Sequence, residues 1–227
     1  PYLINQHPEY WIRDGANNPQ PLNSSYVVVN PTMPEVKQHI WNVVDDITTK
    51  YAVDGVHLDY IRLLNDTSGS AMTFPTDPAT VTRFQTVPGN AGKTPAANSS
   101  DYKAWCAGEI TKLVAGIRQT MKDNLPAAQL TAAVWRDANI GYNSYQQDWK
   151  TWVDRGLVDA AMPMIYRKGF GDGSIAGTSA DGSNLYRNNV TSGVNWQGNA
   201  GIMPGLGPYM QDDAATAYGN FYQQLQY

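Results

Sequence analysis

Short apolar runs alternate along this chain with longer stretches in which apolar residues recur at helical spacing. The first run, residues 26–29, is β-branched and is closed by Asn30 and a proline, which is typical of a buried strand. A helical pattern follows at once, and the pair Thr32 and Glu35 predicts a capping box at its start. We therefore expect a strand followed directly by a helix that ends near Lys50.

The same alternation continues along the rest of the chain. Segments rich in Gly, Pro, Ser, Thr and Asn separate some of the elements and are expected to be loops. Strands are expected at residues 53–61, 130–134, 158–165 and 202–206. Helices are expected at residues 105–121, 144–156 and 214–225, the second of them with a capping box at Ser144 and Gln147. Loops are expected at residues 63–100 and 168–200. Strands that alternate with helices pair in parallel through crossovers, so we predict an α/β fold, either a (β/α)8 TIM barrel or a doubly wound open sheet.

Glycine-rich phosphate-binding fingerprints do not follow any of the predicted strands. The chain has neither G-x-G-x-x-G nor G-x-x-x-x-G-K, so a nucleotide or dinucleotide site loses its main support. With 227 residues, 42% of them hydrophobic, the chain is long enough for one substantial core. We therefore expect a single domain over residues 1–227.

Composition narrows the classes of partner. Charged residues make up 16% of the chain and its formal net charge is −4, which argues against nucleic acid, because phosphate binding needs clustered Lys and Arg. Aromatic residues make up 11%; such rings serve as flat platforms in sugar sites, and the same rings also fill large cores. No apolar run approaches the ~18 residues of a membrane helix, so no membrane span is expected.

The sequence gives little evidence for a metal site or for a catalytic cysteine. Cys106 is the only cysteine, and its helical surroundings predict a small buried apolar residue rather than a nucleophile. The three histidines, His7, His39 and His57, lie in a predicted loop, helix and strand without ligand spacing. We expect neither a metal nor another cofactor.

Residues 53–62 place polar groups at the carboxyl end of an otherwise apolar strand. In a parallel barrel that end is the catalytic face, and alternation along the strand directs His57 and Asp59 together into the barrel mouth. An acid among apolar neighbours is costly to desolvate unless it is hydrogen-bonded or used, so Asp59 is our candidate nucleophile or base. His57 or Arg62 would keep it ionised, although His57 could also be a satisfied buried histidine and Arg62 a surface ion-pair partner.

Four stretches of the chain resemble motifs of one known family. Residues 7–11 resemble its HPEW stretch, residues 29–36 its LNP…PEV strand-to-helix junction, residues 51–62 its YDVDGIHLDYIR strand, and residues 162–166 its PMxY strand. In this order, across nearly the whole chain, they resemble the glycosyl hydrolase-like family 10, a family of bacterial TIM-barrel glycoside hydrolases. The resemblance implies a barrel that hydrolyses O-glycosidic bonds.

Two departures from that family concern the extent of the barrel. Family domains are longer and open with about three further strands, which are not found before residue 7 here, and no obvious closing strand follows residue 206. We therefore expect the C-terminal portion of a partial barrel. Either the sequence is a fragment of a longer protein, or another chain or segment completes the sheet, because open edges expose unpaired backbone groups.

Glycoside hydrolysis needs a second carboxyl. Asp137 is the best candidate, because it follows the predicted strand 130–134 beside Trp135 and Arg136, where an aromatic wall and a cation could bind a sugar. Asp137 could instead cap a turn. Weaker rivals are Asp148, Asp159 and Asp172, and the residues at or just past strand ends that we expect to contact substrate are Asn30, Tyr60, Tyr166 and Tyr209.

These patterns together favour a secreted, periplasmic or cell-surface glycoside hydrolase that acts on a polysaccharide or oligosaccharide by carboxylate acid/base catalysis. The alternative from another class is a non-catalytic barrel that binds glycans or builds a surface assembly. The spacing of acids around Asp59 separates the two: about 5–5.5 Å suits a retaining enzyme, about 6.5–9.5 Å an inverting one, and no second acid in reach favours binding.

Overall fold

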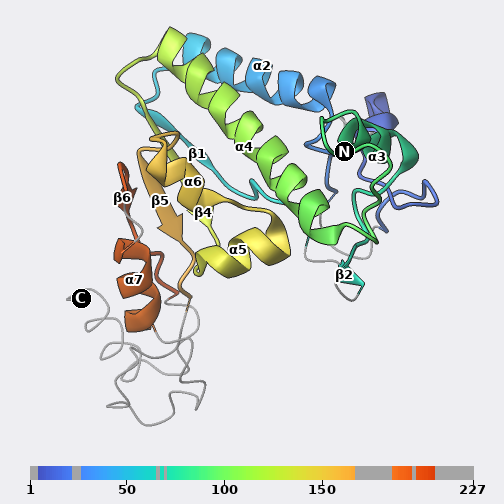
Figure 1. Cartoon of the computed structure of the whole chain (residues 1–227). Helices are drawn as coiled ribbons and strands as arrows, with labels where there is room; N and C mark the ends of the chain where they lie inside the picture. Colours follow the sequence, from blue (N-terminus) through green and yellow to red (C-terminus); the bar gives the residue numbers. More distant parts are fainter. Residues whose placement is uncertain are drawn as a thin grey trace. The chain divides into compact units, whose positions relative to one another are not determined.

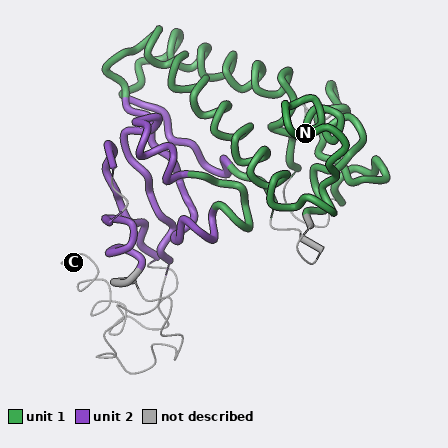
Figure 2. Tube along the Cα trace, viewed as in Figure 1, with its two compact units in different colours: residues 1–54, 62–128, 142–148 green, residues 55–61, 129–141, 149–227 purple. Residues whose placement is uncertain are grey.

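The structure of the chain, a computed structural model, describes residues 5–21, 27–64, 67–68, 71–166, 186–195 and 198–207. The chain divides into two compact units, coloured separately in Figure 2 and described separately below. Unit 1 comprises residues 1–54, 62–128 and 142–148, and unit 2 comprises residues 55–61, 129–141 and 149–227. The single domain expected over residues 1–227 stays a prediction.

Unit 1 is built on two long helices that lie side by side, α2 (Pro34–Lys50) and α4 (Ser99–Asn124) (Figure 1). Gly116 on α4 lets the helices approach closely, because a Cβ at this position would overlap the indole of Trp41 on α2. The same indole donates from Nε1 to the carbonyl of Leu113 at 3.0 Å. Along α4 a stripe of buried residues at helical spacing, which includes the fully buried Cys106, faces the core of the unit.

Unit 1 also contains a shorter helix, α3 (Pro78–Gln85), and the 3-10 turn η1 (Pro8–Tyr10). Asp77 caps α3 by accepting from the amide of Thr80 at 3.0 Å, and a proline occupies the first turn. Phe84 of α3 packs edge-on against Tyr102 of α4, with ring centroids 5.0 Å apart. A two-stranded antiparallel ribbon, β2 (Thr67–Ser68) and β3 (Ala71–Met72), precedes the helix.

Unit 2 contains a parallel sheet whose strands lie in chain order: β1 (Gly55–Leu58), β4 (Gln129–Val134), β5 (Ala160–Pro163) and β6 (Gly201–Ile202). A doubly wound sheet reverses its strand order at a switch point, whereas neighbouring strands of a barrel follow one another around the arc. The described sheet shows no reversal. The α/β fold is confirmed, and the strand order is that of consecutive barrel strands.

The two faces of this sheet differ. On helix α7 (Tyr186–Asn195), a Cβ at Gly193 would lie 3.2 Å from Ile202 and 3.9 Å from Pro163, so α7 packs on the face that carries these two side chains. The opposite face carries His57, Thr131, Ala133, Ala160 and Met162. Helices α5 (Ala138–Tyr145) and α6 (Trp149–Asp154) lie between β4 and β5 in the chain, and α6 buries both of its tryptophans.

Several expectations about single elements were wrong. Residues 27–29 form no strand, only one bridge between Val29 and Trp11. Helix α2 begins after Met33 without a side-chain cap, because the hydroxyl of Thr32 donates to Asn30 at 2.7 Å instead. Ser144 caps nothing, since it lies inside α5.

The two predicted loops were wrong in part, because residues 63–100 contain α3 and the start of α4 and residues 168–200 contain α7. The helix expected at residues 214–225 lies outside the described residues. The other predicted elements were confirmed with shifted ends, most clearly α2, α4 and β4. These errors leave the predicted alternation of strands and helices intact.

Candidate active site

The candidate site lies at the carboxyl edge of the parallel sheet in unit 2. Because β1, β4 and β5 are parallel, the residues that follow them meet at one edge. In barrels this edge carries the catalytic residues. The structure thereby brings to one edge six of the residues predicted from the sequence: Asp59 and Tyr60 after β1, Trp135, Arg136 and Asp137 after β4, and Tyr166 after β5.

His57 lies within β1, two residues before Asp59. Its Nδ1 lies 2.8 Å from the hydroxyl of Thr131, its register partner on β4. The ring therefore lies on the face of the sheet opposite the one covered by α7, as the alternation predicted. Sequence reasoning missed Thr131, although its place in the alternation of residues 130–134 was a signal for it.

Asp59 directly follows β1, where the backbone bends. Its Oδ1 accepts a hydrogen bond from the amide of Tyr60 at 2.8 Å, and Tyr60 adopts φ +54°. A left-handed backbone is uncommon for a bulky residue and is found preferentially at functional sites. Both side chains are exposed. The desolvation cost expected for Asp59 from its apolar neighbours was therefore wrong, and its second carboxylate oxygen is accessible to a ligand.

Asp137 has a structural partner. Its Oδ1 accepts from the amide of Ile140 at 2.9 Å and so caps the start of α5, as a turn-capping aspartate would. The guanidinium of Arg136 lies 5.5 Å from the ring centroid of Trp135, a cation–π contact that gives the two side chains a common position beside the acid. The role of Asp137 as proton donor stays a prediction.

Comparison with known proteins assigns the family. Residues 2–192 match the family described as Glycosyl hydrolase-like 10. The chain belongs to this family. It is also similar to the glycosyl hydrolase DigH of Escherichia coli strain K12 and to that of Shigella flexneri, each 26% identical over 170 residues, 69% of this chain and 34% of the relative. The chain thus spans about a third of the length of these curated relatives.

Solved structures support the fold. The crystal structure of the β-galactosidase from the psychrophilic Marinomonas ef1 superimposes with a TM-score of 0.50 at 13% identity, over 75% of this chain and 30% of that one. The chain therefore has the fold of TIM-barrel glycosidases, as the motifs of the glycosyl hydrolase-like family implied. At this identity the likeness concerns the fold alone.

The weaker candidates for the second acid lie in different parts of the chain. Asp159 precedes β5, at the amino edge of the sheet, and its Oδ2 accepts from the amide of Leu130 at 2.7 Å. Asp148 belongs to unit 1, where its charge adds to the effect of burial in raising the pKa of Tyr142. Asp172 lies outside the described residues. Of the acids named from the sequence, Asp59 and Asp137 are the described ones at the carboxyl edge.

The remaining predicted residues lie in unit 1 or outside the described part. The guanidinium of Arg62 lies 5.9 Å from the ring centroid of Tyr145, both in unit 1. Asn30 is buried: its Oδ1 accepts from the amide and hydroxyl of Thr32 and its Nδ2 donates to Thr80, so one amide hydrogen is left for a ligand. Tyr209 lies outside the described residues.

The arrangement of the described residues, which are those of residues 5–21, 27–64, 67–68, 71–166, 186–195 and 198–207, bears on a metal site and on a membrane span. Among them there is no group of three or more His, Cys, Asp or Glu side chains arranged to hold a metal ion. None of the helices in this part of the chain is both long enough and apolar enough to cross a membrane.

Proposed function

We propose that this chain is the sugar-processing part of a secreted or cell-surface glycoside hydrolase that cleaves O-glycosidic bonds of a polysaccharide in a cell wall or extracellular matrix. The observation that carries the proposal is the place of Asp59, directly after β1 at the carboxyl edge of a parallel sheet of glycosidase type. Membership of a glycosyl hydrolase-like family supports the same reaction class.

Asp59 is assigned the role of nucleophile or base. An exposed carboxylate whose Oδ1 is fixed by the amide of Tyr60 keeps its second oxygen free to approach an anomeric carbon or a water molecule. Asp137, or an acid outside the described residues, donates the proton to the leaving oxygen. Trp135 and Arg136 at the same edge offer a ring and a cation for the sugar.

The test is the substitution Asp59→Asn, assayed by release of reducing ends from a panel of cell-wall and matrix polysaccharides. We expect the rate to fall by ~10³-fold or more with unchanged thermal unfolding, because the amide keeps the shape of the side chain and removes its charge. Asp54→Asn is the matched control, since Asp54 is an exposed aspartate just before the same strand. An Asp59→Asn variant as active as the control would remove Asp59 from this role.

One observation favours a second candidate, a non-catalytic glycan-binding barrel. Asp137, the other described acid at this edge among those named, caps α5. A protein of this kind would retain sugar binding and release no reducing ends from any substrate of the panel. Binding with the Asp59→Asn variant equal to wild type, together with no turnover by wild type, would support this candidate.

A further inference from the structure

Unit 1 contains a polar cavity that is lined by its own residues. Its volume is about 500 Å³, within the range of about 300–1,000 Å³ that small-molecule sites occupy. The residues that matter for its chemistry come from three segments of unit 1 and are Glu9, Trp11, Arg13, Asn30, Asp77 and Arg83. Of these, only Asn30 was predicted from the sequence as a substrate contact.

The segment that carries Trp11 is held by its backbone on both sides. The amide of Ile12 donates to the carbonyl of Val28 at 3.0 Å, and the amide of Asn30 donates to the carbonyl of Tyr10 at 2.8 Å. Ile12 itself is fully buried. The backbone that carries Trp11 is therefore held in place before any ligand arrives, which lowers the entropy cost of binding.

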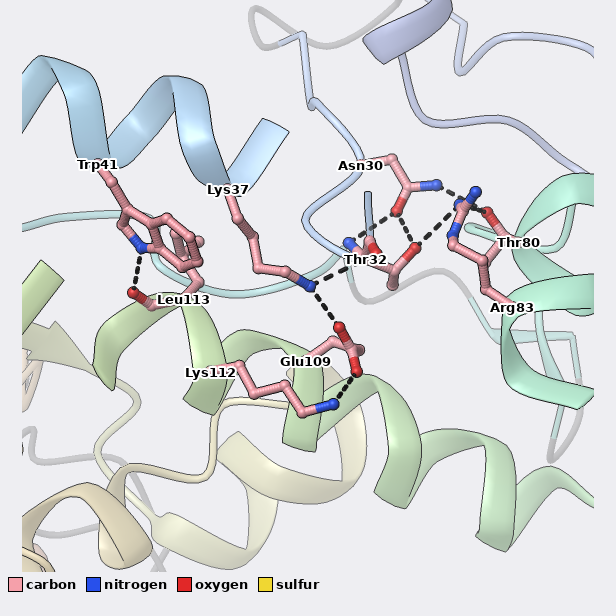
Figure 3. A network of polar contacts seen from close by, with 9 residues as sticks. All are labelled: Asn30, Thr32, Lys37, Trp41, Thr80, Arg83, Glu109, Lys112 and Leu113. Atoms are coloured by element: carbon pink, nitrogen blue, oxygen red, sulfur yellow. Dashed lines mark hydrogen bonds and ion pairs between the residues drawn. The ribbon is translucent and has the colours of Figure 1, made fainter. Parts of the chain in front are cut away.

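Two residues that line the cavity, Asn30 and Arg83, belong to the polar network drawn in Figure 3. Arg83 donates from Nη2 to the hydroxyls of Thr80 at 2.7 Å and Thr32 at 3.2 Å, and Asn30 donates to Thr80 at 2.8 Å. Thr80 in turn donates to the carboxylate of Asp77 at 2.6 Å. The guanidinium and the amide thus keep a single orientation.

Two donors of this cavity lack acceptors. Trp11 Nε1 and Arg83 Nε are buried, and no described residue accepts a hydrogen bond from either. Asn30 retains one amide hydrogen as well. Buried donors in proteins are nearly always satisfied, so a ligand that brings acceptor oxygens and shifts these side chains slightly would gain their hydrogen bonds.

The charges around the cavity balance. Arg13 and Arg83 supply two cations, and Glu9 and Asp77 supply two carboxylates. Hydrogen bonds from its own backbone and from His7 hold the pKa of Glu9 below its usual value, so this acid is ionised at neutral pH. A balanced set of donors and acceptors suits a neutral polyhydroxylated ligand, whose hydroxyl groups both donate and accept.

We infer that this cavity is a binding subsite for an uncharged pyranose unit of a glycan. The indole of Trp11 supplies apolar surface for the sugar ring, Arg83 and Asn30 donate to hydroxyl oxygens, and Glu9 accepts from a hydroxyl. The inference rests on the proposed function for the choice of a glycan. It adds a site in unit 1 that the strand edge of unit 2 does not contain.

The test is isothermal titration of the chain with two neutral probes, cellotetraose and N-acetylchitotetraose. We expect wild type to bind at least one of them, Trp11→Ala to weaken that binding by ~10-fold or more, and Glu9→Gln to weaken it by ~3-fold, as loss of a central aromatic and of a rim contact predicts. Tyr51→Ala is the matched control, because Tyr51 is an aromatic residue of unit 1 with 62% exposure outside the cavity. Thermal unfolding checks each variant, and Trp11→Phe, which keeps a ring and removes the N–H, replaces Trp11→Ala if the alanine variant does not fold.

Each outcome decides the inference. Unchanged affinity in the folded Trp11 and Glu9 variants overturns it, as does wild-type protein that binds neither neutral probe or that binds tetragalacturonate more tightly than both. The Asp59→Asn variant separates this inference from the proposed hydrolysis. If substitution of Trp11 weakens binding but the wild-type protein shows no turnover, the proposed hydrolysis is refuted and the subsite is not. If the wild-type protein shows turnover but substitution of Trp11 leaves the affinity unchanged, the subsite is refuted and hydrolysis is not.

Discussion

Polar side chains serve different ends in the two units. In unit 1, Lys37 of α2 and Glu109 of α4 are buried and paired, and Glu109 also pairs with the exposed Lys112 at 2.6 Å (Figure 3). In unit 2, His57 of β1 and Asp59, which directly follows the strand, are exposed. Substitutions in the first unit should therefore alter stability, and substitutions at the strand edge of the second should alter ligand chemistry.

The largest effect on stability is expected from Glu109→Ala. The side chains of Lys37 and Glu109 are only 8% and 9% exposed, and removal of the acid leaves the buried ammonium of Lys37 unpaired. Burial raises the pKa of Glu109, but hydrogen bonds from Lys112 and Lys37 outweigh it and hold the pKa below its usual value. We expect the free energy of unfolding in urea to fall by about 3–5 kcal/mol.

Asp101→Ala on the same helix is the control, since its partner Lys93 is more exposed and exposed pairs contribute little. The double substitution Lys37→Met with Glu109→Leu should recover most of the lost stability, because it removes both charges together. Equal stability of Glu109→Ala and Asp101→Ala would show that the buried network does not hold α2 against α4.

A smaller effect is expected from Gly116→Ala. A methyl group at this position overlaps the indole of Trp41, so the two helices must separate or the ring must move, at a cost of about 1–3 kcal/mol in free energy of unfolding. Gly108→Ala on the same helix meets no atom within 4 Å and should stabilise the protein by up to about 1 kcal/mol, since alanine favours the helix. Thermal unfolding of both variants is the measurement, and a Gly116→Ala protein as stable as the Gly108→Ala protein would contradict close packing at Gly116.

The sequence predicted these two regions unequally well. Periodic apolar residues located α2, α4 and β4, because each element is long or is apolar on a face that the chain must bury. Helix α3 was missed even though Asp77 and the proline after it are a helix start signal, since the surrounding composition is that of a loop. Short helices depend on tertiary contacts, here those of Phe84 with α4, which no local pattern reveals.

The candidate site was predicted in part. Parallel pairing follows from the alternation of elements, and it alone brings residues after β1, β4 and β5 to one edge. The capping of α5 by Asp137 and the burial of Asn30 in a network with Thr32 and Thr80 depend on neighbours that are distant in sequence or on the exact helix start. The cavity around Trp11 is lined by residues from three segments of the chain, and spacing along the sequence does not show that these segments lie together.

The smallest change in stability, and the sharpest contrast between the units, is expected from Thr131→Val. Valine keeps the shape of the side chain and removes the hydroxyl that lies 2.8 Å from Nδ1 of His57. His57 is exposed, so the free energy of unfolding should fall by no more than about 1 kcal/mol. The imidazole of His57, two residues before Asp59, loses the contact that orients it. We therefore expect kcat/KM for the best polysaccharide of the panel to fall by about 10-fold, mainly in kcat.

Thr49→Val is the counterpart in unit 1, where the hydroxyl donates to the carbonyl of Asp45 at 2.7 Å on the exposed side of α2. It also removes a single exposed hydrogen bond, and it should leave kcat, KM and their pH profiles unchanged. If the two valine variants have the same kcat and KM, the contact between Thr131 and His57 has no part in turnover. The division of roles between the two units would then rest on Asp59 alone.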